Sequence, residues 1–317
     1  MTRISRRAVL GAAASAPLLS ARLAAEERPR EFRIGFQKSG AIVVAKQQGA
    51  IERRLKPLGI ESVKWLEFQS GPPMLEAMSV GSVDFGTVGD TPPIFAQAAG
   101  ADLVYVATLP QSDSAVLVPE SSTVRSVAEL KGKKIAFTKG SSAHNFTVQA
   151  VKKAGLAFTD IAPIHLSPAD AAAAFARGSV DAWTIWDPFF ALAEKNQRAR
   201  AIARVNDTVA SHQFYLANGR FAKASPGIVK AALEELGRVG EWAEGNREAL
   251  AQILTEVNGL DIDAQRIAVR RARFAVRPLT TQALADQQVI ADEFHRLGLI
   301  PKPISVRDIA WTAPAAT

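Results

Sequence analysis

The chain has 317 residues, of which 48% are hydrophobic and 22% are charged, and its mean hydropathy is +0.04. This balance excludes a globally disordered chain and a membrane protein with many spans, and the length predicts about two domains. The sequence contains no cysteine, which excludes disulfides, thiolate metal sites and a cysteine nucleophile. The formal net charge is +7, but part of it lies in a segment that we expect to be removed before folding.

That segment is the first 25 residues, which carry four arginines and no acidic residue. A basic start, an uncharged run of 14 residues from Ala8 to Ala21, and small residues up to Ala25 are typical of an export signal cleaved near Ala25. The pair Arg6-Arg7 resembles a twin-arginine signal. A membrane anchor is the alternative, but the run is shorter than the roughly 20 residues that span a bilayer. No cysteine is available for attachment of a lipid.

The rest of the chain, residues 26–317, has 34 basic and 31 acidic residues, a net charge of +3. This near balance gives no reason to expect a nucleic-acid partner. Two basic runs, Lys131–Lys134 and Arg270–Arg273, have no aromatic residues between their charges, and we interpret them as solvated surface or loop charge. The four histidines stand far apart in the sequence, so we expect neither a metal site nor a cofactor.

In the first part of the chain, short apolar runs alternate with helical patterns, which favours parallel sheets flanked by helices. We predict a first unit in which strands and helices follow one another, with strands at 32–37, 62–68, 84–88 and 103–109 and helices at 41–55, 72–80 and 91–99. A strand at 115–118 then crosses into a second unit.

The second unit repeats the same alternation. Its strands are predicted at 134–138, 162–166, 182–186 and 199–203, and its helices at 142–154, 169–177 and 188–195. A return crossing at 213–217 leads into a helical region, with helices predicted at 228–246, 247–257, 263–273 and 280–297. Gly259 and Gly298 mark helix ends in this region.

Two strand–helix units joined by two apolar crossings predict an α/β protein with two lobes and a cleft between them. We expect lobe 1 to comprise residues 26–114 and 215–317, with the C-terminal helices packed back on it. We expect lobe 2 to comprise residues 115–214. The cleft is the natural ligand site, since open α/β sheets bind ligands at the carboxyl ends of their strands.

Three predicted helices begin directly after a strand, at a glycine next to a serine, threonine or aspartate. Their starting sequences are Ser70-Gly71-Pro72-Pro73, Gly89-Asp90-Thr91-Pro92-Pro93 and Lys139-Gly140-Ser141-Ser142. A helix start offers unpaired N–H groups and a partial positive charge, so it attracts anions. Helix capping alone also explains these residue types. Three such starts in two lobes nevertheless favour a binding cleft. Motifs of serine hydrolases, zinc proteases and phosphate-binding loops are absent.

Two tryptophans lie on the predicted strand at 182–186. Because side chains alternate along a strand, Trp183 and Ile185 share one face and Trp186 takes the other. Trp186, at the end of the strand, is therefore placed to reach the cleft and cover an organic group. The alternative is that both tryptophans belong to the core. Asp90 argues against an anion at its own position, and we expect it to cap the helix or accept a bond from a ligand hydroxyl or amine.

Four stretches carry a resemblance to a known family. They are residues 71–77 (GPPMLEA), 80–101 (VGSVDFGTVGDTPPIFAQAAGA), 130–144 (LKGKKIAFTKGSSAH) and 180–189 (VDAWTIWDPF). With them the chain, from about Arg33 to Ile309, resembles the periplasmic aliphatic sulfonate-binding proteins of ABC importers, which are related to taurine- and nitrate-binding proteins. The family usually has Glu at Asp90 and Asn near Ser142, and it differs at 111–113, a segment that bears on which organic tail is accepted.

The resemblance implies a type II periplasmic-binding-protein fold, with mainly parallel sheets, two hinge strands and a ligand between the lobes. It also implies a monomeric periplasmic protein that passes an alkanesulfonate to the permease and ATPase subunits of an importer and is not an enzyme. A taurine, nitrate or other small-anion binder of the same fold is the alternative. An enzyme of the thiamin-pyrimidine-synthase kind is the alternative from another class, although its cysteine-rich motif and histidine cluster are absent here. A ligand sensor for a kinase or other receptor is a third possibility.

A sulfonate is anionic at any physiological pH, so its site needs fixed dipoles and hydroxyl groups. We expect ligand-binding residues at strand ends in both lobes. In lobe 1 they are Gln37, Lys38, Gly71, Asp90 and Thr91, and in lobe 2 they are Ser141, Ser142, His144, Trp186 and Asp187. Lys38 either supplies charge to the site or is a solvated loop residue. Closure of the lobes is expected to bury the ligand.

Overall fold

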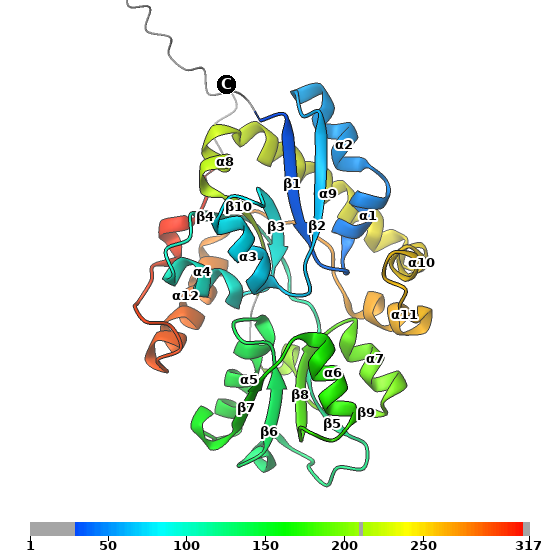
Figure 1. The fold of residues 1–317 in the computed structure, drawn as a ribbon, viewed down its shortest axis with the longest axis vertical. Helices are drawn as coiled ribbons and strands as arrows, with labels where there is room; N and C mark the ends of the chain where they lie inside the picture. The colour runs from blue at the N-terminus through cyan, green and yellow to red at the C-terminus, as the bar shows by residue number, and fades with distance from the viewer. Residues whose placement is uncertain (1–28, 209–211, 313–317) are drawn as a thin grey trace, which may run out of the picture.

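The computed structural model describes residues 29–208 and 212–312. The predicted export signal, residues 1–25, lies outside the described residues. Within the described ranges the chain forms two lobes, each built on a five-stranded sheet with helices packed against it (Figure 1). None of the helices in these ranges is long and apolar enough to cross a membrane.

Five strands form the sheet of lobe 1, and the last of them returns from the other lobe. They are β1 (Glu31–Phe36), β2 (Ser62–Glu67), β3 (Phe85–Val88), β4 (Leu103–Pro110) and β10 (His212–Asn218). Their order across the sheet is β2-β1-β3-β10-β4. β1 pairs in parallel with β2 and β3, whereas β10 runs antiparallel to both β3 and β4.

The sheet of lobe 2 has the same plan. Its strands are β5 (Ser114–Pro119), β6 (Lys134–Phe137), β7 (Ala162–His165), β8 (Ala182–Trp186) and β9 (Ala199–Arg204), in the order β7-β6-β8-β5-β9. β6 pairs in parallel with β7 and β8, and β5 runs antiparallel to β8 and β9.

The prediction of a two-lobed α/β protein with mainly parallel sheets is therefore confirmed. Both sheets are mixed, since each holds one reversed strand. The reversed strands, β10 and β5, are the two that follow a crossing between the lobes. A chain that arrives from the other lobe enters the sheet from its cleft end, so it runs against the strands whose carboxyl ends face the cleft.

Helices cover both faces of each sheet (Figure 1). In lobe 1 they are α1 (Ala41–Gln47), α2 (Ala50–Leu55), α3 (Gly71–Ser79), α4 (Thr91–Ala98), α8 (Gly219–Ala224), α9 (Pro226–Gly245), α10 (Arg247–Asn258), α11 (Ile262–Arg271) and α12 (Thr281–Arg296). In lobe 2 they are α5 (Ser142–Lys153), α6 (Pro168–Ala176) and α7 (Phe189–Asn196). Prolines occupy the first helical positions of α3 and α4, where the missing N–H costs no helical bond.

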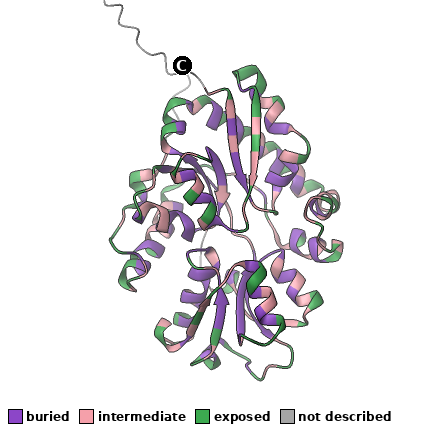
Figure 2. Ribbon diagram, viewed as in Figure 1, coloured by how far each residue is buried: buried purple, intermediate pink, exposed green. Residues whose placement is uncertain are grey.

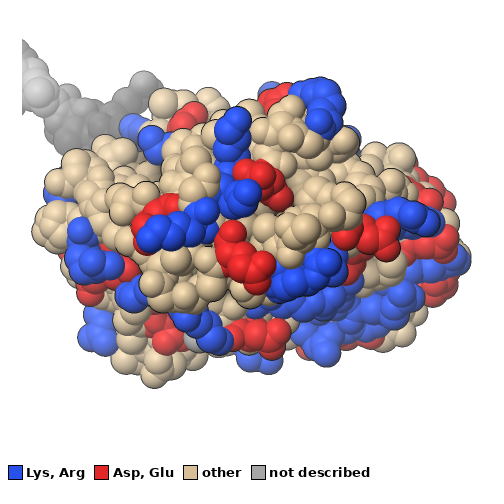
Figure 3. All heavy atoms as spheres, turned by 90° about the horizontal axis from the view of Figure 1, so that it is seen from below, with Lys and Arg blue, Asp and Glu red and all other residues tan. Residues whose placement is uncertain are grey.

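The core follows the periodicity of the sequence. Phe32, Ile34 and Phe36 of β1 are buried on one face of the lobe 1 sheet, under α1, α2 and α9. A second cluster fills the opposite face under α3, α4 and α12, and a third fills lobe 2. Figure 2 shows this burial concentrated on the strands and on the inner faces of the helices. Seen from the end of lobe 2, lysines and arginines gather along one side, with acidic side chains among them (Figure 3).

Three local features differ from the predicted elements. The single helix predicted at 41–55 is divided at Gly49, whose φ of +60° lies in the left-handed region that favours glycine. The short helix α8 was not predicted. The helix predicted to run to Arg273 ends at Arg271, because Ala272 is extended with φ −71° and ψ 157°. Arg273 and Phe274 therefore lie on an extended segment that passes the cleft.

Candidate functional site

The cleft between the lobes contains three neighbouring chambers that share lining residues. The inner chamber has a volume of about 40 Å³ and lies at the meeting point of the two lobes. Its lining residues are Gln37, Ser39, Gly71, Gly89, Pro92, Gln111, Ser112, Ser114, Ser141, Ser142, Trp186, His212 and Gln213. A cavity needs roughly 10–15 Å³ to hold one water molecule, so the inner chamber has room for about three waters or one small oxyanion.

Two helices begin at the inner chamber, one from each lobe. α3 starts at Gly71 after Ser70, and α5 starts at Ser142 after Ser141. Neither serine caps its helix, and the Ser141 hydroxyl donates instead to the carbonyl of Thr138 at 2.7 Å. Pro72 and Pro73 have no N–H, so α3 offers the N–H of Gly71, whereas α5 offers those of its first turn. The positive ends of two helix dipoles meet at the chamber.

Glycines allow the chamber walls to come this close together. A Cβ on Gly71 would lie 2.6 Å from Cγ of Pro92, and a Cβ on Gly89 would lie 2.8 Å from Cβ of Ser142. Gly89 belongs to lobe 1 and Ser142 to lobe 2, so the second approach is a contact between the lobes. Any larger residue at Gly89 would force the lobes apart at this point.

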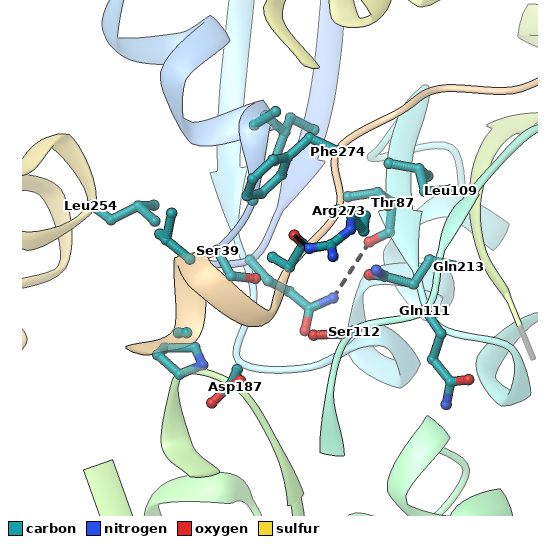
Figure 4. Close-up of a pocket in the computed structure, with 18 of the residues that line it drawn as sticks. Ser39, Thr87, Leu109, Gln111, Ser112, Asp187, Gln213, Leu254, Arg273 and Phe274 are labelled. Carbon is teal, nitrogen blue, oxygen red and sulfur yellow. Dashed lines mark hydrogen bonds between the residues drawn. The ribbon is translucent and has the colours of Figure 1, made fainter. Parts of the chain in front are cut away.

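The side chamber, of about 80 Å³, extends from the inner chamber towards α10 and α11 (Figure 4). It shares Gln37, Ser39, Gln111, Ser112 and Gln213 with the inner chamber. The rest of its wall is Gly40, Ala41, Ile42, Thr87, Leu109, Asp187, Pro188, Tyr215, Leu254, Gln265, Ala268, Val269, Ala272, Arg273 and Phe274. Most of these side chains are apolar, so the side chamber suits the organic part of a ligand.

Arg273 extends into the side chamber (Figure 4). It is exposed, and its guanidinium donates to the carbonyl of its neighbour Ala272 at 2.9 Å. Among the described residues that line the inner and side chambers, it is the one lysine or arginine. Arg273 is exposed and follows the helix, as expected of a solvated loop charge, but the extended chain places this charge at the cleft.

The interpretation of Arg270–Arg273 as solvated charge is wrong for Arg271, which is only 17% exposed. Its guanidinium contacts Glu194, Asp187 at 3.4 Å and Asp113 at 3.8 Å, and it lies 4.1 Å from the centre of the Phe190 ring. Arg271 is the last residue of α11, and its partners belong to lobe 2 and to the link between β4 and β5. The guanidinium therefore joins the two lobes.

Asp187 lines the side chamber beside this cluster and is 6% exposed. Its Oδ1 accepts the N–H of Ala191 at 3.0 Å, whereas its Oδ2 is buried without a hydrogen-bond partner. Burial raises the pKa of the Asp187 carboxyl to about 6, and Arg271 opposes this shift only in part.

The outer chamber, of about 250 Å³, opens on the other side of Gln37 and Ser39. Its wall also contains Lys38, Glu67, Phe68, Gln69, Pro168, Ala169, Trp186, Pro188, Phe189, Asn258 and Leu260. The Lys38 ammonium lies 3.3 Å from the Glu67 carboxylate, so its charge is largely offset. Trp186 lines both the inner and outer chambers, whereas Trp183 is packed in the lobe 2 core against Phe175.

Seven of the ten predicted ligand-binding residues line the chambers. Gln37, Gly71, Ser141, Ser142 and Trp186 meet at the inner chamber, Asp187 lies at the side chamber and Lys38 at the outer chamber. The other three, Asp90, Thr91 and His144, line none of them. Their contacts give these three residues other roles.

Asp90 and Thr91 are buried behind the inner chamber, where they join the lobes. The Asp90 carboxylate accepts the Thr91 hydroxyl at 2.7 Å and the side-chain N–H of Asn145, from α5 in lobe 2, at 2.8 Å. The Asp90 carbonyl accepts the amide of Gln287. The carboxylate that sequence assigned to capping or ligand binding thus forms an interlobe hydrogen bond.

His144 is fully buried among aromatic rings. Its ring stacks on Phe137 at 5.0 Å, meets Phe294 edge-on at 5.1 Å, and accepts the N–H of Gly140 at Nδ1. Burial, with smaller contributions from His165 and Lys139, lowers the pKa of His144 to about 3. His144 is therefore a neutral packing residue that fixes the loop before α5.

The chambers also contain residues that the sequence did not single out. The clearest are Ser39, Gln213, Gln265 and Arg273. Gln265 and Arg273 follow more than 100 residues after the helix starts, and no local motif marks them. Gln111 lies in the 111–113 segment. The difference between this segment and the family pattern was the one sequence signal for that part of the wall. The described residues contain no group of three or more His, Cys, Asp or Glu side chains that could bind a metal ion.

Comparison with known proteins places this geometry in a family. A family model described as NMT1/THI5 like matches residues 62–249. The alkanesulfonate-binding protein SsuA from Xanthomonas axonopodis pv. citri, bound to MOPS, is 40% identical with a TM-score of 0.84, covering 90% of this chain and 99% of that chain. The chain belongs to the NMT1/THI5-like family, in its aliphatic sulfonate-binding branch.

Other members of this group agree. The periplasmic aliphatic sulphonate binding protein SsuA from Escherichia coli is 39% identical with a TM-score of 0.81, covering 91% of this chain and 94% of that chain. The predicted resemblance is thus confirmed. The desulfurization enzyme DszB is similar at 14% identity and a TM-score of 0.64, covering 90% of this chain and 97% of that chain. At that identity the likeness shows the shared fold alone.

Proposed function

We propose that this NMT1/THI5-like chain is the extracytoplasmic binding component of an ABC importer and captures an aliphatic sulfonate in the inner chamber. One observation carries the proposal: the uncapped starts of α3 and α5, from opposite lobes, meet at a small chamber. Among its described lining residues there is no lysine, arginine, aspartate or glutamate. Such a site binds an anion by fixed dipoles and needs no proton transfer.

The chamber offers donors for all three sulfonate oxygens. Hydroxyl groups come from Ser39 and Ser142, and side-chain amides come from Gln37 and Gln213. Each of these amides keeps a second N–H beside the one that it donates to a backbone carbonyl. These donors belong to both lobes, so the ligand completes its hydrogen bonds only when the lobes are together. Trp186 covers one side of the chamber and excludes water from the bound group.

Arg273 adds a positive charge at the side chamber next to the anion site. Because it has no carboxylate partner among the described residues, its field is free to attract the sulfonate during association. The organic tail then extends into the side chamber. The Xanthomonas relative is bound to MOPS, a propanesulfonate that ends in a morpholine ring, so that relative accepts a tail of this kind.

The remaining parts of the proposal rest on the relatives. The Escherichia coli relative is a periplasmic protein, and we propose the same location for this chain after removal of the export signal. We propose that it works as a monomer with the permease and ATPase subunits of an importer. We also propose that it releases its ligand unaltered, because the two close relatives are binding proteins and the chain has no cysteine nucleophile.

Calorimetric titration with butane-1-sulfonate, taurine, nitrate and pentanoate tests the ligand class. We expect butane-1-sulfonate to bind with a micromolar or lower Kd and to raise the melting temperature, since a ligand stabilises the state that it binds. Pentanoate is the matched carboxylate control. Absence of sulfonate binding tighter than millimolar, or tighter binding of nitrate, would overturn the sulfonate assignment.

The variants Arg273→Gln and Lys38→Gln remove one positive charge each from the cleft. We expect Arg273→Gln to weaken sulfonate binding by about tenfold at low salt, and by less at 0.5 M salt because the field is screened. Lys38→Gln is the matched control and should change affinity less, since Lys38 already pairs with Glu67. Equal effects of the two variants would show that Arg273 has no special role.

A further inference from the structure

Two buried polar groups in the side chamber lack partners, and the sulfonate site does not account for them. Oδ2 of Asp187 and Nε2 of Gln265 are both buried without a hydrogen-bond partner, and both residues line this chamber. Gln265 is 1% exposed and Asp187 is 6% exposed. Leaving such a group unpaired costs about 1–3 kcal/mol, and more for a charged group, so each is expected to find a partner in the working protein.

The charges around Asp187 do not cancel. The cluster contains three carboxylates and two guanidinium groups, those of Asp113, Asp187, Glu194, Arg204 and Arg271. One negative charge is therefore in excess. Arg204 contacts Asp113 and Glu194 but not Asp187, and the Arg271 contact to Asp187 is at 3.4 Å and on Oδ1. The excess thus falls mainly on Asp187, at the wall of the chamber (Figure 4).

The raised pKa of the Asp187 carboxyl points the same way, because burial with too little positive charge disfavours its ionised form. A cation placed against Oδ2 would stabilise the ionised form and lower this pKa. Arg273 lines the same chamber, but no ion pair or hydrogen bond joins it to Asp187 in the structure. A positive group that comes with the ligand would supply the missing partner.

We propose that the side chamber binds a protonated amino group on the ligand's tail, with Asp187 as its acceptor and Gln265 as a second polar contact. The substrates preferred by this chain are then zwitterionic aminoalkanesulfonates, with the sulfonate in the inner chamber and the ammonium in the side chamber. This inference rests on the proposed function. A glutamine amide presents either its oxygen or its nitrogen after a half-turn, so Gln265 meets either the ammonium or a neighbouring polar atom.

Ligand pairs of equal shape test the inference directly. Each pair exchanges a terminal ammonium for a methyl group: taurine and propane-1-sulfonate, 3-aminopropane-1-sulfonate and butane-1-sulfonate, 4-aminobutane-1-sulfonate and pentane-1-sulfonate. Calorimetry at pH 7.5 and low salt gives the ratio of the two Kd values for each pair. We expect the amino compound to bind at least tenfold tighter in at least one pair.

Two variants show whether Asp187 and Gln265 cause that preference. We expect Asp187→Asn to abolish it and Gln265→Met to reduce it at least threefold, because methionine fills the same volume without an amide. Glu120→Gln removes one negative charge from an exposed side chain of lobe 2 and is the matched control that should keep the ratio. If Asp187→Asn fails to fold, Gln265→Met, which leaves the ion cluster intact, decides the question.

The outcomes separate this inference from the proposed function. If no sulfonate of either kind binds, the proposed function fails. If the alkanesulfonates bind but no pair favours the amine, or if the preference persists in both variants, the sulfonate site stands and the ammonium site is overturned.

Discussion

The contact between Gly89 and Ser142 makes a strong prediction, because a single methyl group there opposes closure. The Cβ of an alanine at position 89 would lie 2.8 Å from Cβ and 3.0 Å from Oγ of Ser142. Carbon atoms normally approach to roughly 3.5–4.0 Å, so the lobes must separate by about 1 Å at this point. Overpacking of this kind costs about 1–3 kcal/mol.

That cost applies only to the arrangement in which the lobes are together. Since about 1.4 kcal/mol corresponds to a tenfold change, Gly89→Ala should weaken binding of butane-1-sulfonate by about 5-fold to 150-fold. Calorimetry measures this loss directly. The melting temperature of the ligand-free protein should change little, because Gly89 lies outside the three hydrophobic clusters of the lobes. If Gly89→Ala binds butane-1-sulfonate as tightly as the unchanged protein does, the close contact between Gly89 and Ser142 in the bound form is refuted.

A double variant separates the clash from any direct effect of the new methyl group on the ligand. Ser142→Gly removes both atoms that the methyl group meets, and it keeps the backbone N–H of α5. Alone it should cost about 1 kcal/mol for one lost hydroxyl donor. The double variant should bind about as well as Ser142→Gly alone, since the two changes are coupled. If the losses of binding free energy in the two single variants simply add in the double variant, the steric explanation is contradicted.

Two further predictions concern stability. Arg271→Met removes the cation that joins the buried carboxylates of Asp113 and Asp187 to the half-buried Glu194, and it should lower the free energy of unfolding by about 3 kcal/mol in urea titrations. Arg198→Met, at an exposed side chain, is the control and should change the free energy of unfolding by less than about 0.5 kcal/mol. His144 has a folded pKa of about 3, so below pH 6.5 the unfolded chain takes up a proton that the native protein does not, and stability is lost as the pH falls. Between pH 7 and pH 5 the free energy of unfolding of the unchanged protein should therefore fall by about 2 kcal/mol more than that of His144→Phe. If urea titrations at the two pH values give equal falls for both proteins, His144 is not buried as described.

The sequence predicted the parts of the site that depend on local pattern. Gly71, Ser141 and Ser142, which line the inner chamber, were predicted because a strand end followed by a glycine and a helix start is a short-range signal with a physical meaning. The same signal also selected Asp90, which lines none of the chambers, because the local sequence does not distinguish a helix-capping residue from one that bridges two lobes. Only the position of Asn145, 55 residues later and in the other lobe, distinguishes the two roles.

The side chamber was not predictable because its wall is assembled from distant segments. Gln265 and Arg273 come from the C-terminal region, and their place in the cleft depends on where α11 ends. The pattern predicted that this helix continues to Arg273, which would have placed both arginines on the helix and on nearly opposite faces of it. The extended backbone at Ala272 separates them, so Arg271 enters the ion cluster and Arg273 enters the chamber.

The contacts that flank the cleft explain why a ligand can control the lobes. On one side of the cleft, the Asp90 carboxylate accepts a hydrogen bond from Asn145, and the Lys152 ammonium lies 3.1 Å from the Glu293 carboxylate. On the other side, Arg271 forms an ion pair with Glu194, and the buried contact between α7 and α11 is made by alanines. Polar contacts can be exchanged for water at a small net cost, and small side chains do not interlock. Apolar contacts cross the boundary as well, because His144 packs against Phe294 and Val148 belongs to the cluster under α3, α4 and α12. Separation of the lobes therefore has a cost, and a sulfonate that bonds to both lobes raises that cost further, since a ligand shifts the balance towards the form that it binds better.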